Sequence, residues 1–565
     1  MVWSSDSCND QSFNQTRDPC VGLSTIQVSA SSSQSAVAAA AALVNAVSSC
    51  CMNLCLTFLP PYLQPRKGNG YGGMPAGMGA GQEAVIFSYG DDEKRVAFLE
   101  KRDQNSSSSY SGGGDGAAAA ALVERSGTVW TAVAHIITGV IGSGVLSLQW
   151  SVAQLGWAAG PAAMVMFAAV TLVSAFLLCD CYRSPHPLLG PSRNRSYLQA
   201  VNLTLGRTKA WACGVLVHTS MYGIGIAYTI TAAISMRSIQ QSACTTYNNN
   251  NNKKEDGACD MSWHMLVFGL AEMFMSQIPN FHDIQWLSNV AALMSLAYSF
   301  IGLGLGFARV LENGYVKGSM TGIRGATPVD KMWKVSQALG DIAFAYPYSL
   351  ILIEIQDTLK SPPSENETMK KASTVAILVT TVFYLCCGGF GYAAFGEDTP
   401  GNLLTGFTHP HWLLDFANAC IVLHILGGYQ VYCQPVFATA EKWLVETFPD
   451  SILVRHSSVK LPVPAAGRNV EVKVLRLCFR TLYVASTTAI AMMFPYFNQV
   501  IGVLGGFMYW PVSIYFPVEM YVKQREVEAW TVKWVLLHLF SVFCLLLICF
   551  ALVGSVQGLL TAHLG

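Results

Sequence analysis

Residues 133–147 read Val133-Ala134-His135-Ile136-Ile137-Thr138-Gly139-Val140-Ile141-Gly142-Ser143-Gly144-Val145-Leu146-Ser147 and open the first long apolar segment of the chain. Three glycines stand within six positions here, and each weakens a helix by about 1 kcal/mol relative to alanine. We therefore expect the helix to break at Gly142-Ser143-Gly144. Unpaired backbone groups inside a membrane are tolerated only where protein encloses them around a cavity. Such breaks are typical of secondary transporters, although small residues also serve where membrane helices pack together.

The composition predicts a protein that crosses the lipid bilayer several times. The 565 residues are 52% hydrophobic and only 12% charged, with a mean hydropathy of +0.37. Soluble proteins carry about 25% charged residues. The formal net charge of zero argues against a nucleic-acid partner. Seventeen cysteines include no pair of Cys-x-x-Cys motifs, so we expect no metal site and no other cofactor.

The N-terminal region differs in composition from the rest of the chain. Residues 1–125 are rich in Ser, Ala, Gly and Asn, which is typical of a disordered tail. Within them, residues 36–63 carry no charge, and a signal-like or membrane-inserted segment is the alternative interpretation of that stretch. We expect residues 126–559 to form one transmembrane domain and residues 560–565 a short C-terminal end.

Apolar windows of spanning length follow one another from Thr128 onward. We predict eleven membrane spans, so the two termini lie on opposite sides; the spans are 128–154, 157–181, 211–236, 262–279, 286–310, 333–356, 372–394, 411–437, 474–495, 498–522 and 532–558. One alternating set of loops is richer in Lys and Arg, and the positive-inside rule places that set and the N-terminus in the cytoplasm and the C-terminus outside. Cys244 and Cys259 flank an Asn-rich external loop and form a candidate disulfide if this loop faces an oxidising compartment.

A second break is predicted in the sixth span. Pro347 lacks a backbone donor and clashes with the preceding turn, which frees carbonyl groups around Ala343. A glycine break in span one and a proline break in span six match an inverted repeat of five plus five helices. The pair favours a transporter more strongly than either break alone, because single proline kinks are common in membrane helices.

Several long stretches also resemble a known family, the plant amino acid permeases of the amino acid/auxin permease superfamily. The resemblance runs from about Ser126 to Leu559 and is carried by 134–148, Ala153-Gln154-Leu155-Gly156-Trp157, Ser276-Gln277-Ile278-Pro279-Asn280-Phe281-His282, 340–346, Glu354-Ile355-Gln356-Asp357-Thr358, Gly391-Tyr392-Ala393-Ala394-Phe395-Gly396 and 429–435. It implies an all-α membrane protein with eleven helices, a LeuT-like core of the first ten, and proton-coupled uptake of amino acids. The plasma membrane is the location that the family implies, and residues 1–125 lie outside the resemblance.

The two breaks supply candidate substrate-binding residues. A carboxylate is favoured at the N-terminus of a half-helix, which in span one begins at Gly142, Ser143 and Gly144. Carbonyls freed near residues 137–139 and around Ala343 would accept hydrogen bonds from the ammonium group. Phe344 and Tyr346 are candidates to line the side-chain pocket, with core packing as the alternative for either ring.

Coupling to protons needs an ionisable group inside the membrane, where such groups are costly. We identify Asp341 first, because it lies near the second break, then His135 and, less directly, His424. Asp415 is a further acid within the eighth span, whereas Glu354 and Asp357 approach the cytoplasmic end and are expected to form a gate or a solvated pair. The residues alone do not exclude a sodium site. The expectation that protons drive transport comes from the resemblance.

Two other functions remain open at this point. An auxin-type or other organic-acid carrier of the same superfamily would keep both breaks and change the pocket. A sensor would bind an amino acid without transporting it. An enzyme is not expected, because no ordered His/Asp or Ser/His cluster appears in the sequence. The identity of the amino acid and the oligomeric state do not follow from the sequence.

Overall fold

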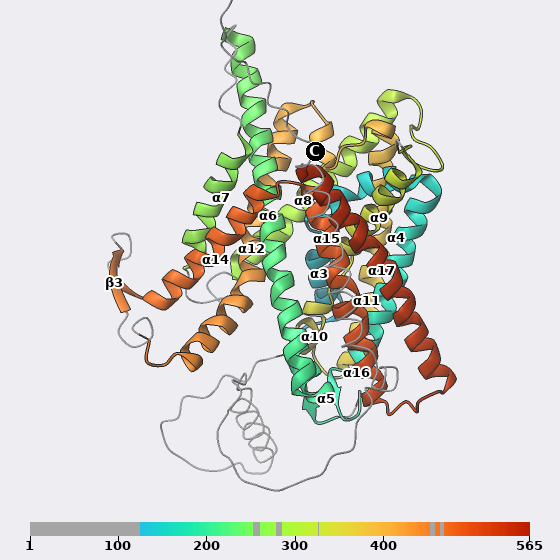
Figure 1. The fold of residues 1–565 in the computed structure, drawn as a ribbon, viewed down its shortest axis with the longest axis vertical. Coiled ribbons are helices and arrows are strands. Elements are labelled where there is room, and N and C mark those ends of the chain that lie inside the picture. The colour runs from blue at the N-terminus through green and yellow to red at the C-terminus, as the bar shows by residue number, and fades with distance from the viewer. Residues whose placement is uncertain are drawn as a thin grey trace, which may run out of the picture.

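The computed structural model describes residues 125–564 apart from 189, 252–259, 278–284, 326, 452–457 and 464–467. This part of the chain is a helical bundle with two small hairpins (Figure 1). Its elements are α3 (Val129–Val140), η1 (Ser143–Ser147), α4 (Leu148–Asp180), β1 (Arg183–Ser184), β2 (Ser192–Arg193), α5 (Tyr197–Leu205), α6 (Arg207–Asn251), α7 (Met261–Ser276), α8 (Gln285–Asn313), α9 (Pro328–Ala345), α10 (Ser349–Asp357), α11 (Glu365–Phe395), η3 (Gly396–Asp398), η4 (Leu403–Gly406), α12 (His411–Thr447), β3 (Ser458–Val463), β4 (Arg468–Lys473), α14 (Val474–Met493), α15 (Phe497–Trp510), η5 (Pro511–Tyr515), α16 (Phe516–Gln524) and α17 (Val532–Leu564).

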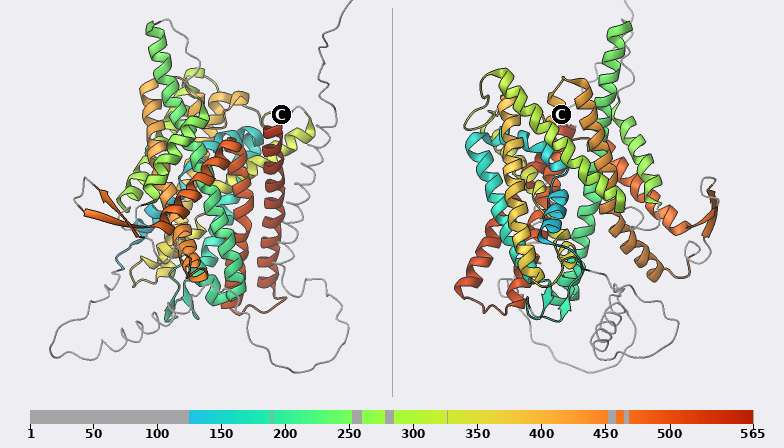
Figure 2. Two further views of the ribbon diagram at one scale, coloured as in Figure 1. Left: turned by 60° about the vertical axis from the view of Figure 1, so that its left-hand side comes forward. Right: turned by 180° about the vertical axis from the view of Figure 1, so that it is seen from behind.

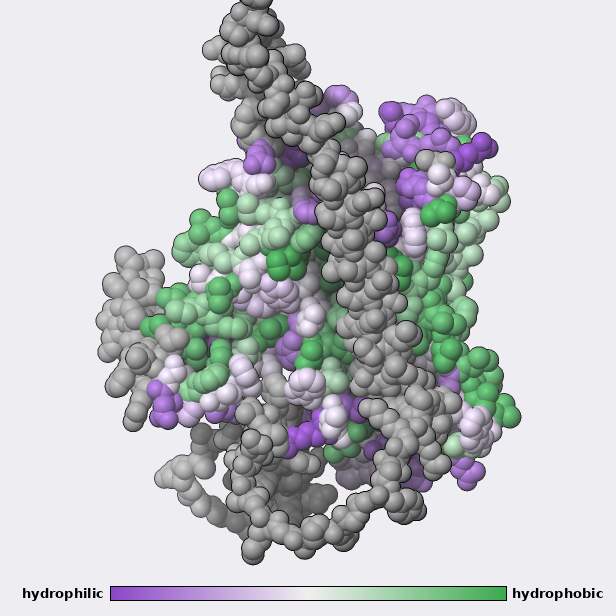
Figure 3. Space-filling view, in the orientation of Figure 1, coloured by the Kyte–Doolittle hydropathy of each residue, from purple (hydrophilic) through white to green (hydrophobic). Residues whose placement is uncertain are grey.

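The helices are long and apolar enough for a membrane. Within the described residues, nine helical segments meet the length and hydropathy required to cross a bilayer, α3 is a shorter apolar helix of 12 residues, and α7 has 16 residues. On the face shown in Figure 3, hydrophobic residues gather mostly across the middle and hydrophilic residues at the upper and lower ends. This arrangement is consistent with eleven spans. Helix α3 starts the first span and α7 is the fourth, while the segment that contains η1 and α4 holds both the end of the first span and the whole second one.

The first break is present where the glycines predict it. Helix α3 ends at Val140, and a 3₁₀ helix, η1, begins at Ser143 after two non-helical residues. Gly142 has φ −136° and ψ −148°, far from helical values. The N–H groups at the start of η1 have no intrahelical acceptor, so this half-helix presents free donors inside the bundle.

The second break is also confirmed. Helix α9 ends at Ala345 and α10 begins at Ser349, so Pro347 sits in the centre of the interruption. The helix continues slightly further than expected: Ala343 lies within α9 rather than at its end. The proline removes the N–H that would have continued the helix, and the chain resumes it two residues later.

A glycine also reverses the chain between the first two spans. Helix α4 contains Gly156 at φ 84° and ψ 175°, where one helical part stops and the next starts. A side-chain carbon at this position would lie 2.3 Å from the backbone N of Gly322 and 2.4 Å from the carbonyl O of Met320. Only glycine fits this conformation and this close approach. The turn is covered by the loop that joins α8 to α9.

Two groups of helices surround the breaks. The broken helices pack against α4, α11, α15 and α17, while α6, α8 and α12 pack together on the other side and α7 and α14 lie outside α6. Figure 1 shows α7, α12 and α14 leaning away from the rest, and Figure 2 shows the β3–β4 hairpin projecting beside them. We call the end of the bundle that holds α5 the α5 end; it is the lower end in Figure 1.

The termini of the described chain lie at opposite ends of the bundle. Residues 125–128 contact the end of α10, which packs near α5, while α17 rises to the C-terminal label at the top of Figure 1. Helix α17 continues through Leu564, beyond the predicted limit of the span at 558. Residues 1–124 of the predicted tail 1–125 and the partner Cys259 of the proposed disulfide lie outside the described residues, as does the side chain of Cys244.

Candidate functional site

A cavity lies where the two breaks face each other. It is lined by residues of both broken helices and of α6, α12, α15 and η5: Gly139, Val140, Gly142, Ser143, Gly144, Ile224, Tyr228, Phe344, Ala345, Pro347, Tyr348, Ser349, Leu350, Ile351, Tyr432, Leu504, Gly505, Met508, Val512 and Ser513. None of these side chains carries a formal charge. The polar groups that remain are hydroxyls and the backbone of the breaks.

The first break forms one wall of this cavity. Gly142, Ser143 and Gly144, all predicted from the sequence, line it. Ser143 is 2% exposed, and its Oγ has no hydrogen-bond partner in the described structure. A buried hydroxyl without a partner costs free energy unless a ligand or water satisfies it. A side-chain carbon at Gly144 would lie 3.0 Å from the Cα of Ala345, so glycine is needed for the two breaks to approach.

Two side chains from the other helix group point at the first break. Nδ1 of His424 lies 2.8 Å from the carbonyl O of Ala291. Nε2 of the same ring has no hydrogen-bond partner in the described structure. A side-chain carbon at Gly142 would lie 3.6 Å from that Nε2 and 4.0 Å from the hydroxyl of Tyr228. His424 does not itself line the cavity, but it borders the glycine that does.

A single tyrosine joins the two breaks. The hydroxyl of Tyr384 on α11 lies 2.7 Å from the carbonyl O of Val140 and 3.1 Å from that of Ala345. These carbonyls end the helical parts that precede each break, so they lack the usual helical donors. Because the hydroxyl has one proton, it donates to one carbonyl at a time and holds both within hydrogen-bonding distance. Tyr384 therefore fixes the spacing of the breaks from outside the cavity.

The residues predicted around the second break separate into two groups. Phe344 lines the cavity, but Ala343 and Tyr346 do not. The ring of Tyr346 turns toward Tyr384, with ring centroids 5.3 Å apart at an edge-to-face angle of 76°. Ala343 lies inside α9 with no exposed surface. The two residues pack because α9 stays helical through Ala345, which directs their side chains away from the opening.

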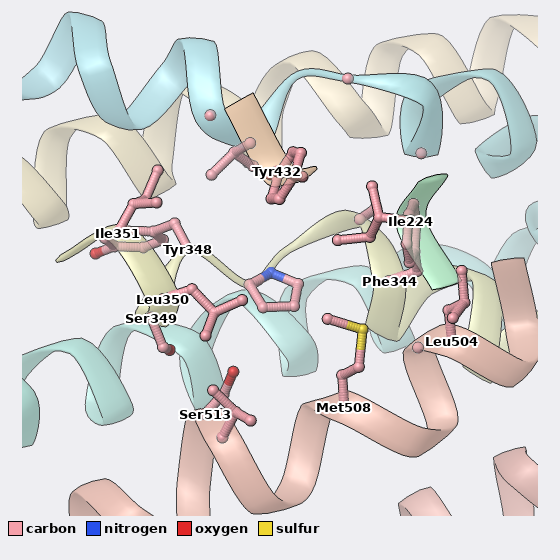
Figure 4. A pocket seen from close by; sticks show the side chains of 18 of the residues that line it. Ile224, Phe344, Tyr348, Ser349, Leu350, Ile351, Tyr432, Leu504, Met508 and Ser513 are labelled. Atoms are coloured by element: carbon pink, nitrogen blue, oxygen red, sulfur yellow. The ribbon is translucent and has the colours of Figure 1, made fainter. Parts of the chain in front are cut away.

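The remaining wall is apolar and comes from helices without a predicted role. Figure 4 shows Met508 reaching into the space below Tyr432, with Phe344 and Leu504 on one side of it and Leu350 on the other. The tenth span contains a π-helical segment, η5, which brings Val512 and Ser513 to the cavity. π-Helical segments are rare and often accompany functional sites. No prediction was made for this irregularity, although Pro511 and Pro517 were a visible signal.

Asp341 lies beside the cavity rather than in it. The side chain is fully buried, and Oδ2 accepts a hydrogen bond of 3.1 Å from Nδ2 of Asn498, while Oδ1 has no partner in the described structure. A side-chain carbon at Gly502 would lie 2.9 Å from Oδ1, so the carboxyl group faces α15. One helical turn separates Asp341 from Phe344 and Ala345. The acid thus bridges the broken helix and a helix that also lines the cavity.

The other predicted ionisable residues are further away. His135 is on the exposed face of α3 and does not line the cavity. Asp415 accepts a 2.9 Å hydrogen bond from Ser242. The carboxyl group of Glu354 lies 3.3 Å from the backbone N of Tyr197 at the start of α5. The structure therefore places Asp341 and His424 nearest to the breaks.

A polar cluster fastens the two broken helices together at the α5 end. Arg125 contacts Asp357 through a 2.9 Å bond from Nε to the carbonyl and a 3.0 Å bond from a terminal nitrogen to the carboxylate. Tyr182 donates a 2.7 Å hydrogen bond to the same carboxylate. Burial and this bond both raise the pKa of Tyr182, so its hydroxyl stays a donor. The backbones of Gly127 and residues 358–360 also pair, with bonds of 2.9 and 3.0 Å.

Two more ion clusters lie at this end. Asp180 accepts hydrogen bonds from Lys370, Asn366 and Arg525, and Glu365 pairs with Arg183 at 2.8 Å and with Arg193 at 3.2 Å. They join the ends of α4, α11 and α16. Asp357 was predicted to form a gate or a solvated pair, and it lies in a closed contact between the segments that flank α3 and α10.

No group of three or more metal-ligating side chains occurs among the described residues.

The sequence analysis missed a second fully buried acid, Glu272 on α7. It lies in the predicted span 262–279, so its charge inside an apolar window was a usable signal. Tyr384, Tyr228 and Tyr432 were also missed. For these tyrosines no local signal exists, because their position beside the breaks depends on how the helices pack.

Three comparisons with known proteins bear on this architecture. Residues 125–561 match the family model described as transmembrane amino acid transporter protein. The chain is 55% identical over 448 residues to probable amino acid permease 7 of Arabidopsis thaliana, covering 79% of this chain and 96% of the relative. It is 51% identical over 444 residues to amino acid permease 2 of the same plant, covering 78% and 89%. Among solved structures, a nucleobase-cation-symport-1 family transporter in a closed conformation aligns with a TM-score of 0.44 at 14% identity, over 78% of this chain and 92% of that chain.

Proposed function

Because the chain belongs to the family of transmembrane amino acid transporter proteins, we propose that it is a symporter that couples amino acid uptake to protons. Both Arabidopsis relatives are named as amino acid permeases, not as enzymes. The observation that carries the proposal is the cavity between the two breaks. It offers free backbone groups and the unpaired Ser143 Oγ where the charged ends of an amino acid need partners.

The amino acid backbone would be held by the breaks themselves. Its carboxylate binds at the start of η1, where free N–H groups and the helix dipole favour an anion. Its ammonium binds the carbonyl groups that end α3 and α9. The side chain extends toward Phe344, Leu504 and Met508. A cavity lined without charged side chains suits a substrate whose only charges are on its backbone.

Asp341 is the group that we assign to proton coupling. It is buried without a cationic partner, and its neutral form is favoured there because an uncompensated charge in a membrane interior is costly. Its single bond to Asn498 ties α9 to α15, and both helices line the cavity. Loss of the proton would change this contact and so bias the opening of the cavity. His424 is the second candidate because its Nε2 faces Gly142.

Alternating access follows from the two broken helices moving relative to α6, α8 and α12. We place the α5 end in the cytoplasm, because the loops there are richer in Lys and Arg. The contact between Arg125 and Asp357 then closes the cytoplasmic side, and it opens when substrate and proton are released. We place the protein in the plasma membrane with its N-terminus inside the cell.

An uptake panel tests this function. The protein is expressed in a yeast strain without its own amino acid permeases, and uptake of radiolabelled neutral, acidic and basic amino acids is measured at several external pH values. We expect accumulation of neutral amino acids that rises as the external pH falls and that a protonophore abolishes. Uptake of radiolabelled auxin without uptake of amino acids would favour an organic-acid carrier. Binding without substrate-evoked current in oocytes would favour a sensor.

A further inference from the structure

The strongest feature outside the cavity is a buried acid on α7, in the half of the bundle that contains no break. The side chain of Glu272 has no exposed surface. Its Oε2 accepts a 2.6 Å hydrogen bond from Nε2 of Gln430 on α12, and its Oε1 has no partner among the described residues. An ionisable group inside a membrane is expensive and generally serves a function.

A chain of polar groups leads from this acid toward the α5 end. Gln434 donates a 3.1 Å hydrogen bond to Gln430, one turn further along α12. On α7, the hydroxyl of Ser276 lies 3.4 Å from Nε2 of Gln430. The carbonyl of Ser276 in turn accepts a 2.5 Å hydrogen bond from Arg480 on α14. Hydrogen-bonded side chains in a low-dielectric interior polarise each other, which strengthens the individual bonds.

The chain of polar groups ends in a partly exposed ion pair. Nε of Arg480 lies 2.6 Å from a carboxylate oxygen of Glu441 on α12, and Arg476 contacts the other oxygen at 3.4 Å. Arg480 is 3% exposed and Glu441 is 17% exposed, so the pair is where the chain meets water. Both arginines pair with Glu441, whereas the side-chain partner of Glu272 is the neutral amide of Gln430.

The other groups around Glu272 are neutral. On α12 they are Tyr429 and Cys433. On α14, Tyr483 lies 3.7 Å from the sulfur of Cys433, and on α6, Tyr222 packs edge-on against Tyr483 at 5.1 Å. A carboxylate in these surroundings would be an uncompensated buried charge, which a protein avoids by keeping the acid protonated. The geometry thus provides one buried acid, a line of polar groups from it toward the α5 end, and no second charged group in contact with the acid.

We propose that Glu272 is a second proton-binding site, which exchanges its proton with water that enters from the α5 end along the polar groups of Gln430, Ser276 and the Arg480–Glu441 pair. Gln430 and Tyr432 lie two residues apart on α12 and so face nearly opposite sides of that helix. One side holds the acid and the other lines the cavity. Ionisation of Glu272 loosens the packing of α7, α12 and α14 and slows transport, so the site senses the pH on that side.

The test rests on the proposed function and uses giant inside-out patches from cells that express the full chain. The pipette holds L-alanine at a fixed acidic pH, the voltage is clamped, and the pH of the bath, which faces the cytoplasmic side, is varied. Making the bath more alkaline increases the inward proton gradient and by itself raises the current. We expect the wild-type current to fall instead, by about threefold, because Glu272 ionises.

Glu272→Gln keeps the hydrogen bond to Gln430 and removes the ionisation, so its current should no longer fall at alkaline bath pH. Glu446→Gln, an exposed acid on the same helix α12, is the matched control and should behave as wild type. Gln430→Met removes the donor that stabilises the ionised acid and should move the decline to a more alkaline pH. This second variant keeps the test valid if Glu272→Gln does not reach the membrane.

A wild-type current that rises steadily with bath pH, or a decline that survives in Glu272→Gln, would overturn the proposal while leaving symport intact. If the current of the Gln430→Met variant fell at the same bath pH as the wild-type current, the proposal would also be overturned. Absence of acid-stimulated uptake of every amino acid in the uptake panel defeats the proposed function first, and this proposal with it. The two failures are therefore distinguishable.

Discussion

The broken helices (α3–η1 and α9–α10) and the continuous helices α7, α12 and α14 hold buried polar groups in different ways. Both regions place polar groups inside a membrane, where each unpaired group costs several kcal/mol. At the two breaks the free polar groups include backbone carbonyls, and a single hydroxyl, that of Tyr384, holds two of them. In α7, α12 and α14 the backbone stays helical, and the polar groups are side chains: Glu272, Gln430 and Arg480.

The difference concerns what a ligand can use. The free groups of the broken helices face a cavity, so a substrate can satisfy them, and their arrangement must change when the helices move. In the continuous helices the side chains of Glu272, Gln430 and Arg480 hydrogen-bond to other protein groups, whereas Oε1 of Glu272, Nε2 of His424 and the hydroxyls of Thr447 and Thr488 have no partner in the described structure. We infer that the first region binds and moves substrate and that the second holds the frame and adjusts the rate. Substitutions in the two regions should therefore affect different measurements.

The largest effect is expected from Gly144→Leu. A side-chain carbon here already lies 3.0 Å from the Cα of Ala345, so a leucine forces the breaks apart and fills the start of η1. Displacement of a binding group by about 1 Å can cost 100-fold in rate, and we expect at least that loss of uptake. Gly304→Leu is the matched control, because it lies on α8 with no atom within 4 Å of a new side-chain carbon. Equal uptake by wild type and Gly144→Leu, at equal surface level, would remove the carboxylate from this position.

Asp341→Asn should separate binding from coupling. The amide keeps the shape of the acid and can still pair with Asn498, but it cannot release a proton. We expect uptake to lose its dependence on external pH, with the ratio of uptake at acidic to neutral pH falling to about one. Uptake is measured beside Glu312→Gln, an exposed acid on α8. A variant that still responds fully to acid would transfer the coupling role to His424 or another group.

Tyr384→Phe tests how much the link between the breaks contributes. The substitution leaves the carbonyls of Val140 and Ala345 without the hydroxyl, and an unsatisfied buried group costs about 1–3 kcal/mol. We expect uptake to fall about tenfold, which corresponds to about 1.4 kcal/mol. Tyr392→Phe is the control on the same helix, because its hydroxyl contacts Ser319 in a loop instead. Equal losses in the two variants would show that the bridge has no special role.

The sequence predicted the local causes of the fold well. Both breaks followed from glycine and proline chemistry, which acts within a few residues, and the chain breaks at Gly142 and Pro347 as expected. Helix ends were predicted less well. Helix α11 begins at Glu365 rather than 372, because its first turns carry charges that an apolar window leaves out.

The site was predicted only as far as the breaks reach. Gly142, Ser143, Gly144 and Phe344 line the cavity, whereas Tyr346 packs against Tyr384. Which face of a helix points inward depends on its neighbours, and a pattern of residues in one span does not contain that information. For the same reason Tyr228, Tyr432 and the π-helical segment entered the site without being predicted. Glu272 is different from these residues, because an acid inside an apolar span is visible in the sequence. It was not predicted because the search for ionisable groups concentrated on the region near the breaks.

The smallest effect on uptake is expected from a change in the continuous helices. Arg480→Lys keeps the positive charge but loses the planar group that contacts both Glu441 and the carbonyl of Ser276. We expect uptake per molecule at the surface to change by less than about twofold, while the thermal unfolding midpoint of the purified protein falls by roughly 2–4 °C.

Arg476→Lys provides the control for this change. Arg476 contacts the same Glu441 from the same helix, but at 3.4 Å and with greater exposure, so its replacement should lower the unfolding midpoint less. If Arg480→Lys abolished acid-stimulated uptake and left the unfolding midpoint unchanged, the polar chain of the continuous helices would belong to the transport step itself. The division between a region that moves substrate and a region that holds the frame would then fail, and Glu272 would join Asp341 in the coupling mechanism.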